Sequence, residues 1–439
     1  MEPLRVQPVY FGGGDAQKAL DGIVTDLRSV LGGMVSLLPV AVVPDSASAA
    51  RLDDIISPEA DALLALNLPV WGERLAQIGK PILLWSAGGY YGAWTRDRVS
   101  FLRSRGAKVY DFATPREARE TIRALRAVSL MRRSTILYLG EPAGLTGRYE
   151  MAGVIGSCWD FDAIRERIGP SVKLIPNSHL LRIADSIPHE EARETIERWR
   201  GDFERIENDW EGKLIEVARL YGAMKELLSI NGANALTINC LSDLFKQRFV
   251  TPCIALARLL DEGIPAGCEG DLNTLLTMML FHFISGEPPI MGNVYLFRPQ
   301  RGPGFPPQDV ILEDTKLSLK YNRARFTHDV IPLKPALTKY KLADYHNSGR
   351  GVTAYAELPR GVVTLGRIDP RLDRIVFTVA RVESVEDSVH CRFSAWLKMR
   401  NTEGYVRSIS SHHSAMVYGD WSSILHKAAE MLEIEAIEV

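Results

Sequence analysis

Two acidic residues and a group of histidines are the side chains of this sequence best suited to chemistry. Glu269 and Asp271 stand in the segment CEGD (residues 268–271), and six of the nine histidines lie at or beyond residue 328. Two of these six are adjacent, in SSHHS (residues 410–414). One carboxylate combined with imidazoles from distant positions suits a divalent transition metal such as Mn, Co or Zn.

The two acids follow a predicted strand over 264–268 and precede a predicted helix over 272–285. In open α/β sheets ligands gather at the carboxyl ends of strands, and a helix N-terminus favours negative charge. Positions i and i+2 do not share a helix face, so we expect one of the two acids to point into a site. The alternative for Asp271 is a helix N-cap with no further role. In a strand, neighbours point to opposite faces, so at most one of His412 and His413 should reach a given metal.

Strand and helix patterns alternate over the first two thirds of the chain, which indicates parallel sheets covered on both faces. A strand over 81–85 is followed by a helix that Thr95 should cap, and a charged helix from His189 should present a solvated face. After Gly286 helical periodicity fades and β-rich runs follow. We therefore predict an α/β protein with two doubly wound parallel-sheet domains, residues 1–132 and 133–289. An antiparallel β-rich domain should follow over residues 290–439.

Composition excludes several classes of function. The chain has 439 residues and a formal charge of −2, so no basic field favours nucleic acid or an anionic membrane. The most apolar run, 272–284, is shorter than the roughly 18 residues that span a bilayer. The first residues lack a signal-peptide pattern and the five cysteines are scattered, which predicts a cytoplasmic protein. The GxGxxG, Walker, GxSxG and HExxH motifs of nucleotide binding, hydrolases and zinc proteases are absent.

Three segments together resemble the L-fucose isomerase and L-arabinose isomerase superfamily. CEGDLNTLLTMMLFHFISGEPPIMGN (268–293) is similar to the family's acidic motif, helix and turn. YKLADYHNSGRGV (340–352) with GVVTLGRID (361–369) resembles the core of its β domain. SSHHSAMVYGDW (410–421) resembles its metal-histidine segment, and the predicted order of domains is also that of the family.

The resemblance implies a chemistry and a set of residues. In that family Mn²⁺ holds two adjacent oxygens of an unphosphorylated sugar while two acids move a proton between C1 and C2 through an ene-diol. By position, the metal ligands would be Glu269, His328 and His413, and Glu269 and Asp271 would be the catalytic acids. The family's second metal carboxylate falls at Gly292 or Asn293, and neither is acidic here.

Five residues are predicted to bind the substrate, from the resemblance and from the aromatic loop after residue 85. They are Asn293, His346, Arg367, Trp94 and Tyr90. Aromatic faces in that loop would stack on the C–H faces of a sugar. The alternative for the loop is packing within its own domain or on a neighbouring subunit. In the family the first domain of one subunit closes the site of another, which implies a homo-oligomer, a hexamer or a trimer.

The missing second acid leaves other functions open. One alternative is a different carbohydrate-active enzyme on the same scaffold, such as a hydrolase, an epimerase or a lyase. Another is a sugar-binding protein without catalysis. Metal analysis combined with a panel of aldoses separates these alternatives.

Overall fold

The structure is a computed structural model. It describes all residues except 19, 22–31, 86–90, 113, 141–155, 207, 241–243, 245–247, 249, 298–306 and 389–390, and except the side chains of 70, 91–96, 208 and 347. The chain forms two compact units, Met1–Leu130 and Met131–Val439. Within the described residues, no helix combines the length and the apolar character needed to cross a bilayer.

The first unit is built on one parallel sheet. Its strands are β1 (Leu4–Phe11), β2 (Val35–Leu37), β3 (Ala41–Val43), β4 (Ala62–Leu66), β5 (Ile82–Trp85) and β6 (Val109–Phe112). They lie in the order β2-β1-β4-β5-β6, and β3 also pairs with β1. The chain reverses its direction across the sheet at β1, as in doubly wound folds. The prediction of a parallel α/β arrangement is confirmed here.

Helices α2 (Ser46–Ala49), α3 (Leu52–Ile55) and α4 (Tyr91–Ser104) connect these strands, together with the 3-10 segment η2 (Val70–Ile78). Helix α5 (Pro115–Arg133) follows β6, the last of them. Helix α4 begins four residues before Thr95, so the prediction that Thr95 caps it was wrong. The apolar run over 35–43 forms two strands because Pro39 interrupts it.

The second unit begins with a smaller parallel sheet. Its strands are β7 (Thr135–Leu139), β8 (Ser171–Ile175), β9 (Ala235–Ile238) and β10 (Ala266–Gly267), in the order β10-β9-β7-β8. The connecting helices are α7 (Phe161–Arg167), α8 (Asn177–Ser186), α9 (His189–Trp199), α10 (Asn208–Asn231) and α12 (Cys253–Asp261). Helix α9 buries Ala192, Thr195, Ile196 and Trp199 and exposes its charged residues, which confirms the predicted solvated face.

The remainder of the second unit is an antiparallel sheet that closes on itself. Its strands are β11 (Ile290–Tyr295), β12 (Arg323–His328), β15 (Gly361–Ile368), β16 (Arg374–Asp387), β17 (Phe393–Met399) and β18 (His413–Tyr418). They follow the order β15-β18-β11-β12-β17-β16, and β16 pairs again with β15. Strand β19 (Glu435–Glu438) adds to β16 in parallel, and β13 (Lys341–Ala343) and β14 (Thr353–Tyr355) form a separate hairpin. The predicted antiparallel β-rich domain is confirmed.

Three helices accompany the closed sheet: α14 (Gln308–Tyr321), α15 (Thr402–Ser408) and α16 (Ser422–Leu432). Helix α14 was not predicted from the sequence after Gly286, where helical periodicity fades. Only Ser318 of this helix is buried, so the helix lacks the continuous apolar stripe by which a sequence pattern is recognised.

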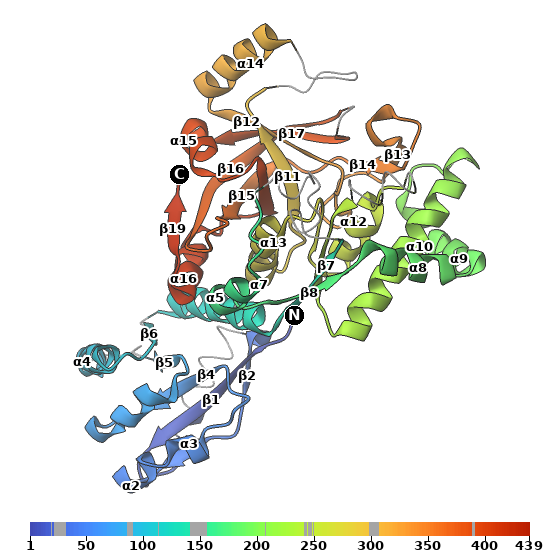
Figure 1. The fold of residues 1–439 in the computed structure, drawn as a ribbon. Coiled ribbons are helices and arrows are strands. Elements are labelled where there is room, and N and C mark those ends of the chain that lie inside the picture. Colours follow the sequence, from blue (N-terminus) through green and yellow to red (C-terminus); the bar gives the residue numbers. More distant parts are fainter. Residues whose placement is uncertain are drawn as a thin grey trace. The chain divides into compact units, whose positions relative to one another are not determined.

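Helix α13 (Leu272–Ser285) carries the CEGD segment onto the closed sheet. Every residue from Leu272 to Ile284 is buried, and the helix packs on β18, β15 and β11 (Figure 1). A helix that is apolar all round is expected in a protein core. Asp271 caps its start, and Gly286 ends it in the left-handed conformation at φ 82°. The helix therefore lies with the strands that follow it, across the expected boundary at 289/290.

Candidate metal centre

Glu269, His328 and His413 come together in the second unit. One ligand atom from each lies within 4.8 Å of the others. Glu269 follows β10, His328 ends β12 and His413 begins β18. The carboxyl end of a parallel strand thus meets the ends of two strands of the closed sheet, and all three metal ligands implied by the resemblance lie in one cluster.

The turn that holds Glu269 has an unusual backbone. Glu269 adopts the left-handed conformation at φ 57°, and Gly270 follows it at φ 70°. The Gly270 N–H donates to the carbonyl of Ile238 at 2.9 Å, and a Cβ at this glycine would collide with the hydroxyl of Tyr138. A left-handed non-glycine residue costs of order 1–3 kcal/mol and persists where its surroundings fix it, often at functional sites. The turn therefore fixes the direction of the Glu269 side chain.

Glu269 and Asp271 lie at opposite nitrogens of the His413 ring. Nδ1 of His413 lies 3.1 Å from Oδ2 of Asp271, and Nε2 lies 3.7 Å from Oε2 of Glu269. The ring is fully buried. An ionised Asp271 accepts a hydrogen bond from the Nδ1–H of His413, which leaves the Nε2 lone pair directed at the cluster. Metal-binding histidines are commonly oriented by a carboxylate in this way.

Asp271 is held by a dense set of donors. Oδ1 accepts from the N–H of Thr274 at 3.0 Å and from the Ser157 hydroxyl at 2.9 Å, which confirms the predicted N-cap. The Arg367 guanidinium spans both carboxylate oxygens at 2.6 and 3.2 Å. Burial alone would raise the pKa of Asp271, but Arg367 and His413 overcome it and hold the pKa well below its usual value. Asp271 therefore stays ionised and orients His413.

His328 supplies a buried imidazole of low basicity. Burial, aided by the neighbouring histidines, lowers its pKa to about 3, so the ring is neutral at physiological pH. Nε2 is buried with no hydrogen-bond partner among the described residues. The N–H of Val330 lies 3.2 Å from Nδ1, at the long end of the hydrogen-bond range. Metal binding through Nε2 requires the proton on Nδ1, so this contact must be given up when a metal binds.

The structure separates the two positions where the family keeps its second acid. A Cβ at Gly292 would lie 2.6 Å from the ring of Phe326, so this residue faces the packed interior of the closed sheet. Asn293 pairs directly with His413 in the ladder, and its side chain is 7% exposed. Its Oδ1 is buried without a hydrogen-bond partner in the described part of the chain. Asn293 is therefore the residue at this position that faces the cluster.

The cluster fits a divalent transition metal. Two imidazoles and one carboxylate are ligands that such ions accept, and both buried Nε2 atoms lack hydrogen-bond partners among the described residues. Burial raises the pKa of Glu269, an effect that His413 opposes and the Asp271 charge reinforces. A cation among the three side chains would remove this penalty, because it favours the ionised carboxylate.

His412 stays outside the cluster, as the alternation of strand side chains predicts. Its ring lies 4.4 Å from that of His413 and stacks on Tyr295 at 6.5 Å between ring centroids. Burial, with the neighbouring His413, lowers the pKa of His412 to about 4. His412 and Tyr295 thus form a neutral aromatic wall beside the ligands.

Of four other residues predicted to bind the substrate, the structure describes the side chains of two. Arg367 is 1% exposed and its guanidinium is engaged by Asp271. His346 lies 4.0 Å from Asp329, within a second group of side chains. Tyr90 lies outside the described residues. Trp94 lies in α4, but its side chain is also outside them.

Sequence reasoning missed Ser157, Asp329 and Cys391. Asp329 directly follows His328, and that adjacency was available in the sequence. Ser157 and Cys391 stand in segments with no recognisable pattern, so only the fold brings them to the site.

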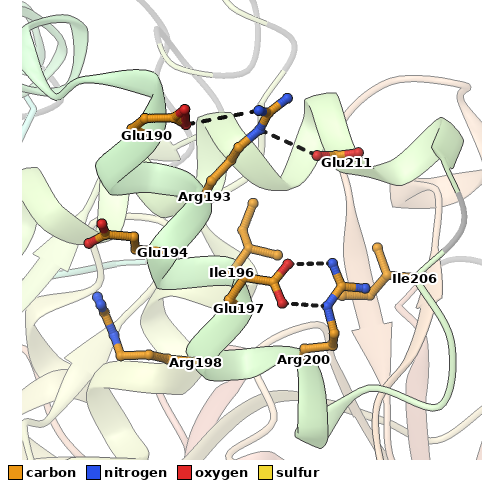
Figure 2. Close-up of a pocket in the computed structure, with 9 residues that line it drawn as sticks. All are labelled: Glu190, Arg193, Glu194, Ile196, Glu197, Arg198, Arg200, Ile206 and Glu211. Atoms are coloured by element: carbon orange, nitrogen blue, oxygen red, sulfur yellow. Dashed lines mark hydrogen bonds and ion pairs between the residues drawn. The ribbon is translucent and has the colours of Figure 1, made fainter.

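A surface pocket lies elsewhere, on the charged face of α9 and the segment that follows it. Figure 2 shows that most of the side chains that line it are acidic or basic, and that several of them form ion pairs across or along the helix. Arg200 forks onto Glu197 at 2.5 and 2.7 Å, and Arg193 lies 3.5 Å from Glu211. None of the predicted site residues lines this pocket. It is a solvated set of ion pairs.

Two curated proteins resemble part of the chain. A sulfoquinovose isomerase from Alkalicoccus urumqiensis is 28% identical over 105 residues, 22% of this chain and 24% of that protein. A sulfoquinovose isomerase from Clostridium sp. (strain MSTE9) is 27% identical over 125 residues, 28% of each chain. The matched stretches thus span about a quarter of these relatives. No protein-family model matches the chain.

Proposed function

We propose that this protein is a metal-dependent aldose–ketose isomerase that acts on an unphosphorylated sugar through an ene-diol. The observation that carries the proposal is the His413 ring, oriented by Asp271 on one nitrogen and facing Glu269 on the other. The two partial relatives, both named as isomerases of a sugar, support the same reaction class. The resemblance to the fucose and arabinose isomerases supports Mn²⁺ as the ion and a homo-oligomer, a trimer or a hexamer.

Each residue has a distinct role in this proposal. Glu269, His328 and His413 would hold the ion, which would supply Lewis-acid chemistry to the sugar. Glu269 would take the proton from C2 of the aldose and return it to C1, as a general base and then a general acid, while the proton of the C2 hydroxyl passes to the C1 oxygen. The resemblance offered Asp271 as a second acid. Its lowered pKa and its hydrogen bonds from four residues support the role of orienting His413 instead.

Arg367 acts through Asp271 and not on the substrate. Its guanidinium is buried on that carboxylate and also donates to the hydroxyl of Thr274. His412 and Tyr295 offer a neutral wall for the sugar.

Isomerisation is tested with purified protein and a panel of aldoses that includes L-fucose, L-arabinose and sulfoquinovose. We expect ketose to form with Mn²⁺, to stop after chelation and to resume when Mn²⁺ is restored. In D₂O the ketose should carry deuterium at C1, because the transferred proton exchanges with solvent on its carrier. Full metal loading without ketose from any aldose would contradict the proposal.

Asn293 favours a second candidate, a different carbohydrate-active enzyme such as a hydrolase, an epimerase or a lyase, or a sugar-binding protein. An amide oxygen can bind a cation but cannot take a proton. The two candidates predict different effects on activity when an acid is introduced at position 293.

We expect Asn293→Asp to tighten Mn²⁺ binding and to raise isomerase activity, because it adds a charge and a proton acceptor opposite His413. General acid–base groups contribute about 10²–10⁴-fold in rate, so the gain should be measurable as kcat. The matched control is Asn293→Leu, which fills similar space without a donor oxygen. A folded Asn293→Asp protein with unchanged metal binding and lower activity would favour a reaction adapted to the neutral amide.

A further inference from the structure

We infer that Asp329, His346 and Cys391 form a second cation site, for a divalent ion of borderline softness such as Zn²⁺. One ligand atom of each residue lies within 4.8 Å of the others. The three residues come from separate segments: Asp329 follows β12, His346 lies in the 3-10 segment η5 (Tyr345–Asn347), and Cys391 precedes β17. No member is shared with the Glu269–His328–His413 cluster.

Asp329 is oriented toward this second group. Its side chain is 5% exposed, and Oδ1 accepts from the N–H of Arg392 at 2.8 Å and from the Thr353 hydroxyl at 3.2 Å. The Arg392 guanidinium pairs with Asp387 at 2.7 Å. Oδ2 remains for His346, whose Nε2 lies 4.0 Å away. Hydrogen bonds that fix one oxygen of a carboxylate and leave the other for the ion are typical of metal ligands.

His346 is held in an unusual conformation beside Asp329. Its backbone is left-handed, with φ 50° and ψ 29°. The ring of Tyr345 stacks on the imidazole, with centroids 4.0 Å apart and planes 15° from parallel. The His346 side chain is 37% exposed, which gives an ion a path to the buried Asp329.

Asn293 places a buried amide between the two groups. It lies opposite His413 in the ladder, and its Nδ2 is 4.0 Å from Sγ of Cys391. Its Oδ1, on a side chain that is 93% buried, has no hydrogen-bond partner among the described residues. The amide nitrogen is thus the end of Asn293 that lies next to Cys391.

The donors determine which ion fits. Zinc is bound by Cys, His and Asp at about 2.0–2.3 Å in a tetrahedral arrangement, so neighbouring donors lie about 3.3–3.8 Å apart. The donors here must move inward by about 1 Å at most, and the partly exposed His346 can make that movement. A thiolate among the ligands favours zinc-like ions, whereas the Glu269 cluster has only nitrogen and oxygen donors.

Cobalt binding to the full chain tests this inference, because a thiolate bound to Co²⁺ gives a near-ultraviolet charge-transfer band. The wild-type protein titrated with Co²⁺ should show this band and bind two ions per chain. Cys391→Ser should abolish the band. His346→Gln should weaken the Co²⁺ affinity, as measured from the growth of the band, by at least about tenfold. Cys158→Ser, a change at a half-buried cysteine outside the group, should leave the band unchanged.

Absence of the band in the wild-type protein, or its persistence in Cys391→Ser, would overturn the inference. If Cys391→Ser does not fold, the partly exposed His346→Gln decides, and an unchanged affinity overturns it equally. Glu269→Gln separates this inference from the proposed function, since it should lose one ion and keep the band.

Discussion

Replacing Asp271 with Asn is expected to destabilise the second unit by about 3–5 kcal/mol, the usual cost of leaving one member of a buried ion pair without its partner. Arg367 is 1% exposed and would keep its charge without a counter-charge, and the Nδ1 proton of His413 would lose its acceptor. Urea unfolding of wild-type and variant protein, monitored by circular dichroism, measures the difference in the free energy of unfolding.

Asp160→Asn is the matched control for this change. Asp160 caps α7 in the same way, accepting from the N–H of Ala163 at 2.9 Å, but it is exposed. Asn is itself a good N-cap, so this control should lower the free energy of unfolding only slightly. If Asp271→Asn costs no more than Asp160→Asn, the ion pair with Arg367 does not stabilise the fold.

The difference in the free energy of unfolding between wild-type protein and Asp271→Asn should also depend on pH. The pKa of Asp271 in the folded protein lies below its ordinary value of 3.8, so its contribution is present above that pH and is lost as the pH falls further. The difference between wild-type protein and Asp271→Asn should therefore shrink below about pH 4.

Glu269→Gln is expected to weaken Mn²⁺ binding by at least about 100-fold and to abolish isomerisation. Changes of residues that merely orient a metal ligand cost about 10–100-fold, and this change removes the charged ligand itself. The same carboxylate carries the proton in the proposed reaction, so restoring Mn²⁺ at high concentration should not restore the rate. Metal content after dialysis against defined free Mn²⁺, together with ketose formation, measures both effects.

Glu287→Gln is a suitable control, because Glu287 is exposed and pairs only loosely with Lys334 at 3.4 Å. This control should keep both metal and activity. A Glu269→Gln protein that binds Mn²⁺ as tightly as the wild-type protein would show that Glu269 is not a ligand.

Elements with clear boundaries in the sequence were predicted well. The bounds of α13 are those predicted, because this mostly apolar run lies between Asp271, which caps it, and Gly286, which ends it. Strand β11 was missed. Five of its six residues are buried on one face or the other, so it shows no alternation, and Gly292 and Asn293 weaken its β propensity.

The candidate site was predicted in part for a similar reason. Glu269 follows from the rule that ligands gather at the carboxyl ends of parallel strands, and Asp271 from its position before a helix. The resemblance supplied His328 and His413. Cys391 was not predicted, because its approach to Asp329 depends on the register of β12 and β17, which no local pattern encodes.

The closed sheet has a consequence for the order in which the chain is made. Strand β18 fills the gap between β11 and β15, yet it is the last of the six strands in the sequence. Until the ribosome has released it, β11 and β15 present unpaired edges, and such edges recruit strands from other molecules. His413, the residue that joins Glu269 to Asp271, arrives on this same strand. The nascent chain therefore lacks a complete Glu269–His328–His413 cluster, so under the proposed function a metal would bind only after this strand has been made. A chain that stops before residue 412 should aggregate even though most of its core has been made.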